Sequence, residues 1–209
     1  MTVQLIEERW KRFEKWSLKS GKHNPDSTFC VMEAVAYVAG EEWSDHPACA
    51  CPVITAFMVS WNDGLPTDAD RDRLLKPLIP LLINTRDKKL EAKRATMAAD
   101  WYVRVQLPAW LRLAGLTRQA DYLASFPEIT SFAKTPSIQA ALESVAEDAE
   151  AAWSAAWSAA ESAAWSAAES AARSAARSAA WSAAEKQLAT TVTELQQSAL
   201  ELVKRMIAA

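Results

Sequence analysis

The chain of 209 residues is 50% hydrophobic and 23% charged, which allows one sizeable core and a smaller appendage. Its net charge of −3 argues against a dedicated binder of duplex DNA or RNA, because such proteins are normally basic or carry a basic face. The 3 cysteines form no disulfide framework and fit a reducing cytoplasm. The sequence has neither a signal-peptide pattern nor an uninterrupted apolar span, so we expect a cytoplasmic protein without a membrane segment.

Glycine and proline occur only in the first part of the chain, since all 4 Gly and all 9 Pro lie before residue 137. This part predicts helices with recognisable ends, such as Thr67 as an N-cap and Gly40 as a C-terminal stop. Pro77, Pro80 and Pro108 are expected to break or bend the path. No segment alternates with period two as a strand does. The expected helices cover residues 3–20 up to Gly21, 27–39 with Asp26 or Ser27 as cap, 52–61, 68–76 and 87–107, with short helices around 120 and 132.

Residues 151–184 repeat the unit Ala-Ala-X-Ser, and its high alanine content predicts a helix. A four-residue step overshoots a helical turn by about 40°, so the X positions wind around the rod. Relative to Trp153, Trp157 is rotated by about 40°, Trp165 by about 120° and Trp181 by about 280°. Because one partner can hardly cover all four directions, we interpret these four tryptophans as the assembly surface of a homo-oligomer.

A helix that begins at Thr135-Pro136 and runs to Ala209 would be roughly 110 Å long. β-Branched residues around Thr190 lower the helical propensity, so we expect a bend there. Beyond it, an apolar stripe fits packing against another helix of this chain or of a second copy. The stripe contains Val192, Leu195, Ala199, Leu202 and Met206. The sequence therefore predicts an all-α fold, with a multi-helix bundle over residues 1–135 and a repeat helix with an amphipathic end over residues 136–209.

The densest polar cluster is the loop from Glu41 to Cys51, between two apolar helices. A zinc site is one interpretation, but the Cys-x-Cys spacing and the lack of a second cysteine pair argue against it. We therefore expect no metal and no cofactor, and favour a helix-capping loop with buried thiols. The zinc ligands would be His46, Cys49 and Cys51 with Cys30 or His23. An alternative is a metal- or cysteine-dependent enzyme centred on Glu33, Asp45, His46 and Cys49.

A second polar constellation is basic and lies between residues 71 and 104. Arginine forks bind phosphate and tryptophan stacks on bases, so this region could hold a nucleotide or another phosphorylated ligand. The alternative is a solvated charged face, neutralised by Asp87, Glu91 and Asp100, with Trp101 turned inward. If a ligand site exists, we expect it where the loop meets the basic helix. Its residues would be Asp45, His46, Arg86, Arg94, Trp101 and Arg104.

The stretch from Phe29 to about Leu116 contains the segment Trp-Ser-Asp-His-Pro at residues 43–47, then Leu-Leu-Lys-Pro-Leu-Ile-Pro-Leu-Leu and Ala-Asp-Trp-Tyr-Val-Arg. In these segments and in its alanine-rich tail the chain resembles a group of uncharacterised proteins from phages and bacteria. That resemblance implies no known activity and no catalytic residues. It does imply that the gene is phage-borne, and small accessory phage proteins often act by binding a host factor or a nucleotide signal.

Two functions follow from these patterns. The first is a non-enzymatic helical binding protein that self-associates through the repeat and sequesters a nucleotide signal or a host protein. The second is the enzyme described above. No phosphate-binding glycine loop, metalloprotease motif or nucleophile elbow occurs in the sequence, so the first hypothesis is favoured.

Overall fold

The computed structural model describes residues 3–23, 28–131, 139–140, 142–147 and 170–209. Over these residues the fold is all-α, as predicted, and contains no strand. One isolated parallel bridge joins Leu18 to Phe29. No helix in these ranges is both long enough and apolar enough to cross a membrane. The expected helix near Phe132 and the start at Thr135-Pro136 lie outside the described residues.

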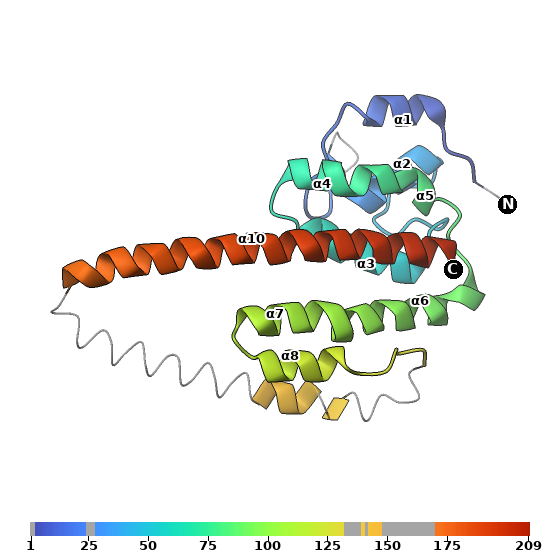
Figure 1. The fold of residues 1–209 in the computed structure, drawn as a ribbon. Helices are drawn as coiled ribbons and strands as arrows, with labels where there is room; N and C mark the ends of the chain where they lie inside the picture. The colour runs from blue at the N-terminus through green and yellow to red at the C-terminus, as the bar shows by residue number, and fades with distance from the viewer. Residues whose placement is uncertain (1–2, 24–27, 132–138, 141, 148–169) are drawn as a thin grey trace. The chain divides into compact units, whose positions relative to one another are not determined.

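Figure 1 shows the order and arrangement of the helices. They are α1 (Glu7–Phe13), α2 (Val31–Ala39), α3 (Pro52–Gly64), α4 (Asp68–Leu75), the 3-10 helix η1 (Lys76–Leu78), α5 (Ile79–Leu82), α6 (Lys88–Trp101), the π-helix η2 (Tyr102–Gln106), α7 (Leu107–Leu113), α8 (Thr117–Ala124) and α10 (Ser170–Ala208).

The first helix is shorter than predicted, because α1 ends at Phe13 and not at Gly21. After α1 the chain becomes extended and Lys19 N–H donates to the carbonyl of Phe29 at 2.8 Å. The N–H of Leu18 donates to the Asp72 carboxylate at 2.9 Å. These partners are distant in sequence, and they bind backbone groups that a longer helix would have used internally.

The second helix begins later than predicted, because Cys30 and not Asp26 or Ser27 is its N-cap. The Glu33 carboxylate accepts a hydrogen bond from Cys30 N–H at 2.7 Å, and the Cys30 sulfur accepts one from Glu33 N–H at 3.5 Å. This is a capping box in which a thiol replaces the usual hydroxyl. The predicted end is confirmed, since Gly40 adopts the left-handed conformation at φ 76°.

The next helices agree with their predicted signals. Pro52 stands in the first turn of α3, and the Thr67 hydroxyl accepts from Asp70 N–H at 3.1 Å to cap α4. Pro77 and Pro80 then divide the path into η1 and α5. The helix predicted over 87–107 is divided into α6, η2 and α7. Pro108 lacks the N–H that would bond one turn back, and the widened π-turn lies directly before it.

The described chain forms two compact units: residues 1–98 with 199–209, and residues 99–198. The predicted boundary at residue 135 does not coincide with this division. The first unit has a core of large, fully buried side chains, namely Phe13, Leu18, Met32, Ile54, Met58, Leu75, Leu78, Ile79, Leu82, Leu202 and Met206. In the second unit Val103, Leu123, Ile129 and Val145 are buried, with Leu107, Leu111, Phe126 and Leu142 packed against them.

The last helix does not break at Thr190, so the expected interruption is wrong. α10 is continuous from Ser170 to Ala208, and the hydroxyls of Thr190 and Thr193 donate to the carbonyls of Lys186 and Ala189 one turn earlier. These bonds let threonine remain in a helix that its branching disfavours. The apolar end of the stripe packs within the chain, because Ala199, Leu202 and Met206 are buried.

Candidate functional site

Arg94, predicted to bind a ligand, is buried in the first unit with 2% of its surface exposed. Its Nε donates to the carbonyl of Met206 at 2.7 Å, and its terminal nitrogen donates to the carbonyl of Thr85. The guanidinium thus connects α6 to the last turn of α10 and to the segment after α5. The guanidinium is thus bound inside the fold through Nε and one terminal nitrogen, and Arg94 has a structural role.

Trp101 and Arg104 belong to the second unit and are also engaged. The Trp101 indole is 7% exposed and donates to the Ser198 hydroxyl at 2.8 Å. Arg104 forms an ion pair with Asp100 at 3.2 Å, and Asp100 also accepts from the N–H of Ile129 at 2.9 Å. The predicted ligand residues are therefore divided between the units, with Asp45, His46, Arg86 and Arg94 in the first.

The polar loop contacts the segment before α6. The N–H of Arg86 donates to the carbonyl of Cys49 at 3.1 Å. Within the loop, exposed His46 Nδ1 lies 3.0 Å from the Asp45 carboxylate, which also pairs with Lys22 at 3.4 Å. The hydrogen bond from His46, followed by the bond from Lys22, lowers the pKa of Asp45. The carboxylate of Asp45 is thus held in its ionised form by the hydrogen bond from His46 and by the ammonium of Lys22.

Two of the thiols, those of Cys30 and Cys49, are in environments that favour the protonated form. Burial, reinforced by Glu41, raises the pKa of Cys49 to about 11. Burial raises the pKa of Cys30 to about 12. A cysteine nucleophile needs the opposite shift. Within the described ranges no three His, Cys, Asp or Glu side chains are grouped as metal ligands.

The contact between partly buried His23 and buried Glu33 is one that the sequence did not predict. Glu33 is fully buried, and its carboxylate accepts from His23 N–H at 2.7 Å and lies 3.0 Å from His23 Nδ1. Trp43 Nε1 donates to the carbonyl of His23 at 2.9 Å. Glu33 thereby fixes the His23 segment, and His23 in turn fixes Trp43. The sequence does contain one indication of this role of Glu33, because an acid three residues after an N-cap is typical of a capping box.

An aromatic cluster surrounds Phe29, which is only 2% exposed. Trp16 stacks on Phe29 with ring centroids 5.3 Å apart and an interplanar angle of 17°. Tyr37 lies 5.3 Å and Trp43 4.8 Å from the same ring. Trp16, Tyr37 and Trp43 keep part of their surface in contact with solvent. We call these three residues the aromatic surface.

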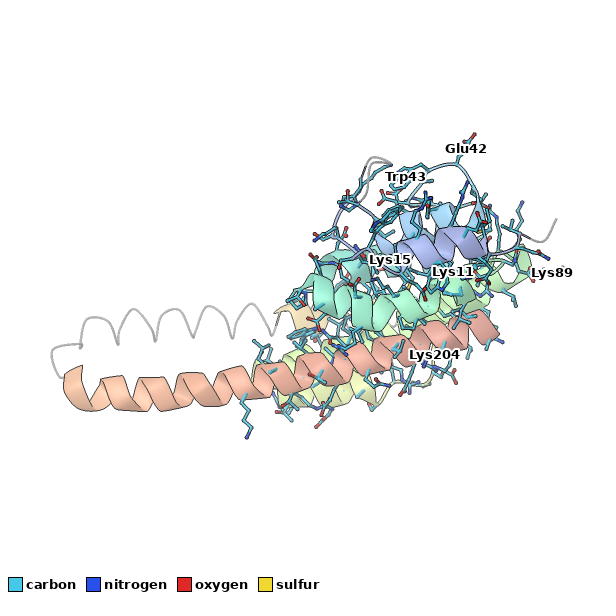
Figure 2. All side chains as sticks on the ribbon, turned by 90° about the horizontal axis from the view of Figure 1, so that it is seen from above. Lys11, Lys15, Glu42, Trp43, Lys89 and Lys204 are labelled. Atoms are coloured by element: carbon cyan, nitrogen blue, oxygen red, sulfur yellow. The ribbon has the colours of Figure 1, made fainter. Side chains whose placement is uncertain are left out.

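Cations border the aromatic surface. The Arg9 guanidinium lies over the Tyr37 ring, 5.2 Å from its centroid, and donates to the carbonyl of Tyr37 at 2.8 Å. Lys15 precedes Trp16 and is exposed. Figure 2 labels Lys15 just after α1 and Trp43 in the loop after α2. This surface could not be predicted from the sequence, because its rings come from three separate segments and pair only in the folded chain.

Comparisons of the chain with protein-family models, with curated proteins and with solved structures found no match.

Proposed function

We propose that this protein is a non-enzymatic helical binding protein that holds a planar phosphorylated ligand, such as a nucleotide, on the aromatic surface. The observation that supports this proposal is the arrangement of Trp16, Tyr37 and Trp43 around the buried ring of Phe29, each with part of its surface open to solvent. Aromatic rings that are both fixed and accessible are suited to stacking on the faces of bases.

The aromatic surface is held in place before any ligand arrives. Trp43 is anchored by its bond to the carbonyl of His23, and Tyr37 by the contact of its ring with Arg9. A ring that is already fixed loses little conformational entropy on binding. A ligand stacked there would therefore retain most of the energy of the contact.

Cations that could contact a phosphate lie on the segments that carry the aromatic surface. Lys15 is exposed beside Trp16, and Arg9 and Lys22 lie on the neighbouring segments. Lys22 is partly neutralised by Asp45, so we assign the main phosphate contacts to Lys15 and Arg9. Asp45 and exposed His46 form the polar edge of the surface and can donate to or accept from sugar hydroxyls.

The enzymatic alternative receives less support from the contacts. His46 pairs with Asp45 and Glu33 pairs with His23, so these side chains are engaged in separate interactions. The pKa of Cys49, about 11, leaves its thiol protonated near neutral pH.

Isothermal titration calorimetry of the full-length protein with AMP, ATP, cyclic AMP and cyclic GMP tests the proposal. We expect saturable binding of at least one nucleotide. Trp43→Ala should weaken it at least about fivefold, since stacking on one aromatic ring contributes about 1 to 3 kcal/mol. Trp110→Ala is the matched control, because Trp110 is 40% exposed on α7 of the other unit. No binding by the unmutated protein, or equal losses in both variants, would refute the proposal.

A further inference from the structure

Exposed cations lie on two segments of the first unit that are joined through Arg94, and neither segment contributes a residue to the aromatic surface. One part comprises the segment before α6 and its first turns, and the other is the last turn of α10. Arg94 bonds to the carbonyls of both Thr85 and Met206, so it holds these two segments side by side. We call the exposed cations on them the basic face: Arg86, Lys88, Lys89, Lys93, Lys204 and Arg205.

The basic face shares its segments with three acidic residues, namely Asp87, Glu91 and Glu201. None of its six cations forms an ion pair with a described residue. Asp87 lies among them, but its carboxylate accepts the N–H of Lys89 at 2.9 Å and caps α6. Lys89 and Lys93 are one helical turn apart, so their like charges repel. An anionic partner would remove that repulsion.

We propose that the basic face binds an acidic segment of a partner protein. Its cations are mostly lysines, whose flexible stems suit carboxylates at irregular spacing. Residues 81–94 and 204–209 contain no aromatic side chain on which bases could stack, which disfavours single-stranded nucleic acid.

Fluorescence anisotropy of a labelled peptide of eight alternating Asp and Glu residues tests this proposal on the full-length protein. We expect saturable binding that weakens as salt rises, because exposed charges are screened. The double variant Lys89→Glu with Lys204→Glu should weaken binding about tenfold or more. The side chains of both lysines are labelled in Figure 2. Circular dichroism should show an unchanged helix content in the variant.

The control is Lys11→Glu with Arg12→Glu, which makes the same change in net charge at exposed positions of α1. Less than a threefold loss in this control would locate binding on the basic face. No peptide binding by the unmutated protein, or equal losses in the two double variants, would overturn the proposal. Tighter binding of a single-stranded oligonucleotide or of phosphatidylserine vesicles would also overturn it, in favour of that partner. The variant Lys89→Glu with Lys204→Glu changes no residue of the aromatic surface or of its neighbouring cations, so nucleotide binding by this variant tests the first proposal separately.

Discussion

The guanidinium of Arg94 donates from Nε to the carbonyl of Met206 at 2.7 Å, and thereby joins α6 to a residue 112 positions later in the chain. A buried cation in this position satisfies two carbonyl oxygens that the core would otherwise leave without a donor. The same contact brings the two halves of the basic face together. Arg94 therefore supports a surface that it does not itself reach.

Replacing Arg94 by Ala should lower the free energy of unfolding by about 2 to 4 kcal/mol, because hydrogen bonds to charged groups contribute about 1.5 to 3 kcal/mol each. Arg94→Lys should recover only part of this loss, since an ammonium lacks the planar fork. Urea denaturation followed by circular dichroism measures the effect. Lys93→Ala, an exposed neighbour, should change the free energy by less than about 0.5 kcal/mol. Equal effects of the two alanine variants would contradict the structural role of Arg94.

Glu33→Gln should destabilise the protein by about 2 kcal/mol, because the buried carboxylate accepts from His23 N–H and Cys30 N–H and an amide replaces one acceptor oxygen by a donor. The midpoint of thermal unfolding provides the measurement. Glu42→Gln is the matched control, since Glu42 is exposed on the loop after α2. If Glu33→Gln and Glu42→Gln unfold at the same temperature, the network through Glu33 contributes little to stability.

The raised thiol pKa values predict a pH dependence. Folding favours the protonated thiols of Cys30 and Cys49, whose pKa values rise from 9.0 to about 12 and about 11. Their contribution to stability is therefore fully present below about pH 9, where the unfolded chain also keeps its thiols protonated. It is lost as the pH rises through about 11 to 12. Unfolding free energies of the protein and of a Cys30→Ala, Cys49→Ala variant should converge over this range. Parallel pH profiles would rule out the effect.

The same shifts predict slow thiol chemistry in the native state. Iodoacetamide should label Cys30 and Cys49 at pH 8 far more slowly than it labels the unfolded chain, because the thiolate is the reacting form. Mass spectrometry of quenched samples gives the rates. Rapid labelling of Cys49 in the folded protein would contradict this prediction and favour the hypothesis of a cysteine-dependent enzyme.

Self-association through the repeat remains a prediction from the sequence. Trp153, Trp157 and Trp165 lie outside the described residues, and only the helical backbone is described at Trp181. Sedimentation of the full-length protein at micromolar concentrations should show a multimer, and Trp157→Ser with Trp165→Ser should reduce its mass by removing large apolar contacts. A monomer at all these concentrations, with unchanged behaviour of the variant, would contradict the assembly surface.

The sequence predicted those helix ends that are set by residues within one turn of the end. Gly40, Pro52 and Thr67 act where expected, because each effect lies within one turn of the residue. Where the structure differs from these predictions, the cause is a contact with a residue distant in sequence. Asp72 and Phe29 bind the chain after α1, and the carbonyl of Met206 accepts a hydrogen bond from the guanidinium of Arg94. Spacing along one helix could show that Arg94 and Trp101 lie near one face, but not that this face is buried.

The central claim, that the aromatic surface holds a nucleotide, is tested most directly by the indole N–H signals in an ¹H–¹⁵N spectrum. Variants Trp16→Phe, Trp43→Phe and Trp110→Phe assign the three signals of interest. On titration with the nucleotide that binds in calorimetry, the signals of Trp16 and Trp43 should shift in a saturable way while that of Trp110 stays in place. Shifts confined to Trp110, or no shift of Trp16 and Trp43 at saturating nucleotide, would contradict the account.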